Sequence, residues 1–101
     1  MDTELQVTGL GDHEFLVVLA KDGERVESEF FIYPEVLEEL GLTGADEEQV
    51  ARYTATFLAE RQPVIDVPAM VDLDAVVASY GDYADHLRQA LDADQRGAAP
   101  S

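Results

Sequence analysis

The chain has 101 residues and a formal net charge of −16, from 22 acidic residues against six Lys and Arg. This charge argues against binding to nucleic acid or to an anionic membrane surface, because both are negatively charged and would repel the protein. The hydrophobic content of 47% indicates one folded domain with a single core rather than a disordered acidic segment. The chain has no cysteine, which excludes disulfides and thiolate-ligated metal sites.

Three strands are expected at the start of the chain. Leu5 and Val7 alternate with polar neighbours, which predicts a short, half-buried strand that ends at a glycine-rich turn over residues 9–12. Residues 13–20 are apolar on both faces and form the strongest predicted strand, so we expect both faces to be covered or one of them to meet a partner. The Asp-Gly pair at 22–23 is a two-residue hairpin signal that leads into a third strand.

The hairpin sets a register that divides the strand residues between two faces. Pairing Lys21 with Glu24 carries on to a pair between Phe15 and Phe30. The face expected to join the core consists of Phe15, Val17, Leu19, Val26, Phe30 and Ile32. The other face is apolar on one strand and charged on the next, and it consists of Leu16, Val18, Arg25, Glu27, Glu29 and Phe31.

Two helices are expected to follow the strands. Pro34 suits the first turn of a helix that stops before Gly41. Asp46 suits the N-cap of the main helix, at about residues 47–61. This helix has an apolar stripe at i, i+3, i+4, i+7 and i+8, made of Val50, Tyr53, Thr54, Phe57, Leu58 and the stem of Arg61.

The second half of the chain is expected to hold an extended segment and two more helices. Residues 63–71 are apolar and contain two prolines, so we expect them to lie over the core and cover their apolar side chains, which are Val64, Ile65, Val67 and Met70. Asp72 is expected to cap a short helix that buries Leu73, Val76, Val77 and Tyr80. Asp82 is expected to cap the last helix, which buries Tyr83, Leu87 and Leu91.

These elements predict an α+β fold, in which a three-stranded antiparallel β-meander is followed by about four helices packed on one face. Residues 1–93 are expected to form the single domain and residues 94–101 a disordered tail. Both edges of the sheet are only partly protected, so a homodimer through the second face or an edge is a further expectation.

No motif points to catalysis or to a cofactor. His13 is expected at the surface, and Asp82 and His86 share a helix face but supply only two ligands toward a metal site. Asp72 and Asp74 resemble the start of a calcium loop, but the glycine and glutamate of such a loop are missing. We therefore expect no catalytic, cofactor-binding or metal-binding residues, and no enzyme.

One stretch of the chain resembles a known group of proteins. The main helix ends in Phe-Leu-x-Glu-Arg-x-Pro within residues 56–63, and Asp72-Leu73, Val76, Tyr80 and Tyr83 follow it. Over about residues 50–90 this pattern is similar to small prokaryotic proteins of unknown function, from which the chain departs in the linker and at Gly81. The resemblance implies a shared fold without an activity, and a packing role in which Glu60 or Arg61 ties the helix end to the linker.

The acidic surface supports two hypotheses about function. The first is a non-enzymatic module for protein–protein interaction or self-association, because an acidic surface favours basic partners. The residues of its expected interaction surface are Glu24, Glu27, Glu29, Phe31, Glu35, Glu38 and Glu39. The alternative is a charge-mimic inhibitor or antitoxin, whose carboxylates replace phosphates at the site of a basic nucleic-acid-binding protein.

The charge also has an explanation that involves no partner. Adaptation to a high-salt cytoplasm, or a GC-rich genome, would favour Asp, Glu and Ala over Lys, and molar salt screens like charges beyond about 3 Å. The longest apolar run, residues 15–20, is too short to span a bilayer, and no signal peptide is recognisable, so a cytoplasmic location is expected.

Overall fold

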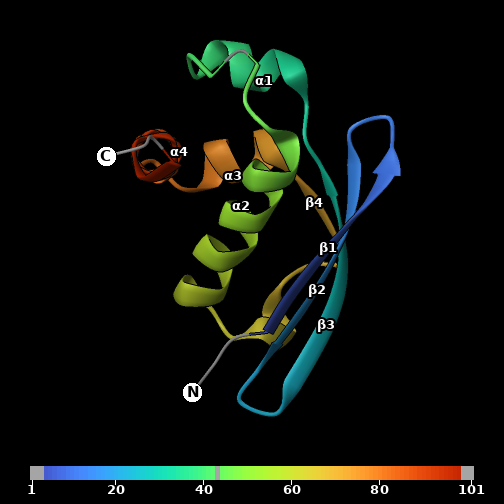
Figure 1. Cartoon of the computed structure of the whole chain (residues 1–101). Helices are drawn as coiled ribbons and strands as arrows, with labels where there is room; N and C mark the ends of the chain where they lie inside the picture. The colour runs from blue at the N-terminus through green and yellow to red at the C-terminus, as the bar shows by residue number, and fades with distance from the viewer. Residues whose placement is uncertain (1–3, 43, 99–101) are drawn as a thin grey trace.

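A sheet forms one side of the molecule and the helices form the other (Figure 1). The computed structural model describes residues 4–42 and 44–98, with side chains described as far as Leu91. In chain order the elements are β1 (Glu4–Gly11), β2 (Glu14–Lys21), β3 (Glu24–Phe31), α1 (Pro34–Glu39), α2 (Glu47–Arg61), the 3-10 turn η1 (Val64–Asp66), β4 (Met70–Asp72), α3 (Leu73–Ser79) and α4 (Tyr83–Ala98).

The hairpin between β2 and β3 has the predicted register. Lys21 pairs with Glu24, and the ladder continues to the pair of Phe15 with Phe30. Both turn residues have positive φ, at 54° for Asp22 and 82° for Gly23, as a type I′ turn requires. The two faces of the strands therefore divide as expected, with Val17, Leu19, Phe30 and Ile32 buried on the helix side.

The turn between β1 and β2 is placed differently from the prediction. β1 continues through the glycines to Gly11, with an irregular register between Gly9 and Gly11, and the turn falls on Asp12 and His13. These two residues have φ values of 51° and 66°. The ladder hydrogen bonds to β2 outweigh the weak strand preference of glycine, so the strand is longer than the sequence indicates.

The α+β class is confirmed, but the prediction of a three-stranded meander is wrong, because β4 adds a fourth strand in parallel to β3. Val71 lies beside Phe30 in this pairing, and the Ser28 hydroxyl donates a hydrogen bond to the Pro68 carbonyl at 2.7 Å. Three residues are too few to show the alternation of a strand, and the strand begins only after Pro68, whose missing N–H would interrupt a ladder.

The segment before β4 covers the core only in part. Val64 and Val67 are buried as expected, but Ile65 and Met70 remain 64% and 62% exposed. The expectation that all four apolar residues would be covered is wrong for these two. The η1 turn leaves Ile65 outside the core, and the pairing of β4 with β3 places Met70 beside the exposed Glu29 while Val71 is buried.

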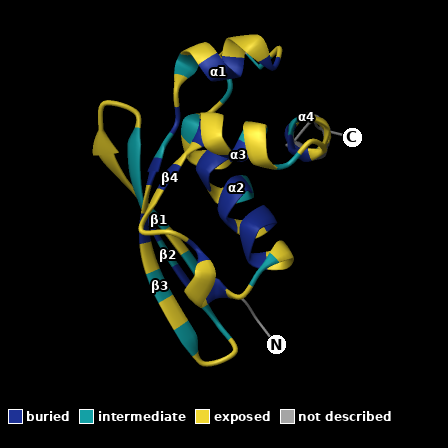
Figure 2. Ribbon diagram, turned by 180° about the vertical axis from the view of Figure 1, so that it is seen from behind, coloured by how far each residue is buried: buried dark blue, intermediate teal, exposed yellow. Residues whose placement is uncertain are grey.

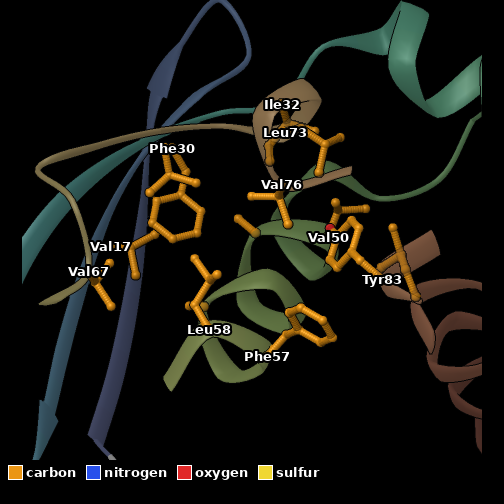
Figure 3. Packing of buried hydrophobic residues seen from close by; sticks show 14 of the residues in the cluster. Val17, Phe30, Ile32, Val50, Phe57, Leu58, Val67, Leu73, Val76 and Tyr83 are labelled. Atoms are coloured by element: carbon orange, nitrogen blue, oxygen red, sulfur yellow. The ribbon is translucent and has the colours of Figure 1, made fainter. Parts of the chain in front are cut away.

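The helices that cover the sheet follow the prediction closely. α2 has the predicted bounds, and the Asp46 carboxylate accepts a hydrogen bond from the Glu48 N–H at 3.0 Å. Its buried side is wider than the predicted stripe, because Ala51, Ala55 and Ala59 are buried as well. Figure 3 shows Val17 and Phe30 from the sheet meeting Leu58 from α2 in the core.

The C-terminal helices bury most of the expected residues, but Val77 and Tyr80, which were also expected to be buried, are only partly buried. Leu73 and Val76 of α3 and Tyr83, Leu87 and Leu91 of α4 are all buried. Asp72 occupies the N-cap of α3 without a capping bond, and its carboxylate instead accepts a hydrogen bond from the Tyr33 hydroxyl at 3.1 Å. α4 extends to Ala98, so the segment expected to be a tail begins inside this helix, and residues 99–101 lie outside the described residues. None of the described helices has the length and apolar character needed to cross a membrane.

Candidate interaction surface

The helices leave one face of the sheet uncovered, and the sheet is partly exposed on that side (Figure 2). On β2, Val17 and Leu19 are fully buried, whereas Leu16 and Val18, at the alternate positions that point to the other face, are only partly buried. On β3, Glu27 and Glu29 are exposed. We call this surface the open face and define it by Leu16, Val18, Glu27, Glu29, Phe31 and Met70.

Carboxylates and apolar side chains alternate across the open face. The strand register places Glu29 between Leu16 of β2 and Met70 of β4, and it places Glu27 beside Val18. Glu27 also lies 3.2 Å from the exposed guanidinium of Arg25. The face therefore offers apolar contacts and negative charges within the same few rows of the sheet.

The structure brings together only part of the surface expected from the sequence. Glu27, Glu29 and Phe31 lie on the open face. Glu24 lies on the other face of β3. Together with Lys21 and others, it lines a hollow of about 310 Å³ near the end of α2. The remaining expected residues, Glu35, Glu38 and Glu39, lie exposed on α1.

Met70 is the member of the open face that sequence reasoning missed. It was expected to lie against the core, and the sequence around it carries no signal for the strand that turns it outward. Leu16 and Val18 were assigned to this face, because the hairpin signal at 22–23 determines the register of both strands. The apolar half of the surface could therefore be predicted where a local turn sets the alternation.

A second cluster joins the end of α2 to the start of α4. Asp82 Oδ2 lies 2.8 Å from Arg61 Nη2 and 3.2 Å from His86 Nε2, so Asp82 and His86 do share a helix face. The Arg61 guanidinium carbon lies 3.7 Å from the centre of the Phe57 ring. Arg61 thus ties the helix end to the turn before α4 rather than to the linker.

The charge of Arg61 determines what this cluster can do. Desolvation alone would raise the pKa of Asp82, but the hydrogen bond from Arg61 and the nearby positive charges outweigh it and lower that pKa. The carboxylate is therefore ionised and already bound to a cation. Within the described part of the chain, no group of three or more His, Asp or Glu side chains is placed to hold a metal ion.

A buried hydrogen-bonded pair lies beneath this cluster. The Thr54 hydroxyl donates its single proton to the Val50 carbonyl at 2.7 Å, and its oxygen lies 2.5 Å from the Tyr83 hydroxyl. Tyr83 must therefore be the donor in the second bond. Burial raises the pKa of Tyr83, so its hydroxyl stays protonated, as the donor in this bond must be.

The only other described histidine lies at the opposite end of α2. His13 Nδ1 is 2.8 Å from both carboxylate oxygens of Glu47. The hydrogen bond to Glu47 raises the pKa of His13, partial desolvation opposes it, and the charges of Glu47, Asp12 and Glu35 add to the increase. The contact connects the β1–β2 turn to the first turn of α2.

This contact predicts a pH dependence of stability. Because the folded pKa of His13 lies above 6.5, its contribution to stability is complete below about pH 6.5 and is lost as the pH rises through the raised pKa. His13→Gln should therefore cost more stability at about pH 5.5 than at about pH 9, measured by urea unfolding of both proteins. Glu47→Gln should remove most of this pH dependence, because Glu47 supplies the hydrogen bond and one of the charges that raise the pKa of His13. Equal costs of His13→Gln at both pH values would show that the pair is not coupled to folding.

The aromatic residues quoted for the resemblance meet in one place. The Phe57 ring lies edge-on to Tyr80 and Tyr83, with centroid distances of 5.3 and 5.1 Å. Together with Arg61 they pack the end of α2 against the start of α4, which is a structural role. A scan against protein-family models and searches of curated proteins and of solved structures find no match for this chain.

Proposed function

We propose that the protein is a non-enzymatic binding module whose open face binds a basic protein partner. The observation that carries this proposal is the apolar outward side of β2, which none of the described elements covers. On a solvated face of an antiparallel sheet, outward positions are normally polar. Leu16, Val18 and Met70 beside Glu27 and Glu29 suit a partner that presents apolar side chains flanked by Lys or Arg.

The carboxylates favour a basic partner over a second copy at this face. Two open faces in contact would bring Glu27 and Glu29 of both copies into one interface, where Arg25 lies 3.2 Å from Glu27 but no ion pair of the described residues neutralises Glu29. The net charge of −16 on each chain adds to the repulsion. A partner with Lys or Arg at these positions would neutralise the same carboxylates while covering the apolar residues.

The charge-mimic alternative draws less support from the arrangement of the acids. A mimic of a nucleic-acid backbone needs a continuous row of carboxylates, like the phosphates that it replaces. The expected row is divided between β3 and α1, and Glu24 lies among the alternating positions that face away from Glu27 and Glu29. The open face instead mixes two carboxylates with apolar residues, which suits an ordinary protein interface.

The proposal can be tested with a short peptide of alternating Lys and Val residues, titrated by calorimetry. The double variant Glu27→Gln/Glu29→Gln should bind this probe between about twofold and thirtyfold more weakly, because two exposed ion pairs are together worth about 0.4–2 kcal/mol. Binding of the unchanged protein should also weaken as salt is added.

A matched control separates the open face from the overall charge. Glu38→Gln/Glu39→Gln removes the same number of charges from the exposed surface of α1. Glu38 and Glu39 belong to α1 and not to the open face, and salt at about 0.15 M weakens the long-range effect of their charges, so this variant should bind the probe almost as well as the unchanged protein. Equal losses in the two double variants would show that the peptide senses only the net charge, and would overturn the proposal.

A further inference from the structure

β1 has a long edge that pairs with no described strand. It stands at the end of the sheet order β1-β2-β3-β4, and its eight residues, Glu4–Gly11, run along that edge. In the described part of the chain, no loop or turn makes a backbone hydrogen bond to these residues. Leu5 and Val7 are only half-buried, and Leu10 is 50% exposed. The edge thus offers unpaired backbone groups beside incompletely covered apolar side chains.

The edge is also the least charged part of the sheet. Glu4 is the one charged residue in β1, whereas β3 carries Glu24, Arg25, Glu27 and Glu29. Natural edge strands are usually protected by charge, proline or short length. β1 has no proline and no lysine, and only the irregularity between Gly9 and Gly11 interrupts it. A strand that approaches this edge therefore meets little negative charge, even if it comes from an equally acidic chain.

We propose that β1 pairs antiparallel with β1 of a second copy of this chain, across a twofold axis, and that the two sheets become one. Such pairing satisfies the free backbone groups of both edges at once, because a twofold interface uses the same surface on each copy. It differs from the proposed function in site and in occupant, since it uses the edge rather than the open face.

The alternation of β1 selects the register of this pairing. Leu5 and Val7 are the half-buried positions of β1, so they must pair with residues on the same face of the second copy. Pairing Leu5 with Val7 of the second copy matches the apolar residues and places Gln6 opposite Gln6 at the twofold axis. Glu4 then lies opposite Thr8 of the second copy, and no two carboxylates in the paired strands face each other.

The pairing would also align the other layers of the two molecules. α2 contacts both β1 and β2, so the α2 helices of the two copies would cover the same side of the joined sheet. The two open faces would then form one surface on the opposite side. A partner with two basic segments could bind both at once, with a gain in affinity from the linked second contact.

The absence of cysteine allows a direct test, because Gln6→Cys introduces the only thiol. Opposite residues of antiparallel strands have Cα atoms about 4.5 or 5.5 Å apart, within the range of about 4.4–6.8 Å that a disulfide spans. Mild oxidation should convert this variant into a reducible dimer of about twice the 11.1 kDa chain mass. The unchanged protein should show a mass that rises above 11.1 kDa with concentration in sedimentation velocity.

Two single-cysteine controls test the register and the face. Thr8→Cys lies on the same side of β1, but in this register its copies are displaced by four residues, or about 13 Å, so it should form little disulfide under the same conditions. Glu27→Cys tests contact between two open faces and should also stay monomeric. Faster cross-linking of either control than of Gln6→Cys would overturn the proposed pairing. A mass of 11.1 kDa at every concentration would overturn the dimer itself.

Salt separates this inference from the proposed function. The dimer brings two chains of charge −16 together, so added salt should strengthen it and should accelerate the Gln6→Cys cross-link. The same salt should weaken the binding of the Lys-Val peptide. Cross-linking without peptide binding would support the edge pairing and contradict the open-face proposal. Peptide binding without cross-linking would support the open-face proposal and contradict the edge pairing.

Discussion

Replacing Phe57 by alanine should lower the free energy of unfolding by about 3–5 kcal/mol, because it removes a buried aromatic ring and leaves a cavity. Phe57 is 2% exposed and lies edge-on to the rings of Tyr80 and Tyr83. The change also removes the surface on which the Arg61 guanidinium stacks. Urea unfolding followed by circular dichroism would measure the loss.

Thr56→Ala is the matched control for Phe57→Ala. Thr56 precedes Phe57 in the same helix, but it is exposed, and its hydroxyl bonds only to the Arg52 carbonyl one turn earlier. This variant should change the unfolding free energy by no more than about 0.5 kcal/mol. A loss below about 1 kcal/mol for Phe57→Ala would mean that the aromatic cluster is not packed as described, since the loss of a buried aromatic ring costs about 3–5 kcal/mol of stability.

Thr54→Val should cost about 1–3 kcal/mol of stability, although valine has nearly the same shape as threonine. The Tyr83 hydroxyl donates to Thr54 at a position where both residues are fully buried. Valine leaves that hydroxyl without an acceptor, and an unsatisfied buried donor carries the full cost of its desolvation. Thermal and urea unfolding would both show the loss.

Because Tyr83 is the donor and Thr54 the acceptor, Tyr83→Phe should cost less stability than Thr54→Val. Tyr83→Phe removes the donor but leaves the bond from Thr54 to the Val50 carbonyl intact, so it should cost only about 0.5–1.5 kcal/mol. In the double variant no donor is left unsatisfied, and its cost should be smaller than the sum of the two single costs. A Tyr83→Phe cost larger than that of Thr54→Val would reverse the assignment of donor and acceptor.

Local signals in the sequence were enough to predict much of the fold. The Asp-Gly turn determined the β2–β3 register because a two-residue loop leaves one way to continue the ladder. The Asp46 cap and the apolar spacing defined α2 because a helix repeats its contacts every few residues. In each case the interacting residues lie close together in the chain.

The features that the sequence did not reveal join distant segments. β4 depends on a partner strand about forty residues away and has too few residues for a pattern of its own. The bonds of Arg61 to Asp82 and of His13 to Glu47 join elements whose relative placement follows only from packing the whole core. The sequence therefore predicted five of the six residues of the open face and missed Met70, which reaches this face through β4.

The parallel pairing of β4 also has a consequence for the order of folding. β1, β2 and β3 are joined by tight turns, whereas Phe30 and Val71 close a loop of 41 residues, the difference between their positions. Longer loops cost more entropy to close, so the hairpins can form before β4 docks. The open face gains Met70 only in that last step. A partner bound across Glu29 and Met70 would hold β4 in place, and would slow the exchange of its amide hydrogens more than that of the hairpins.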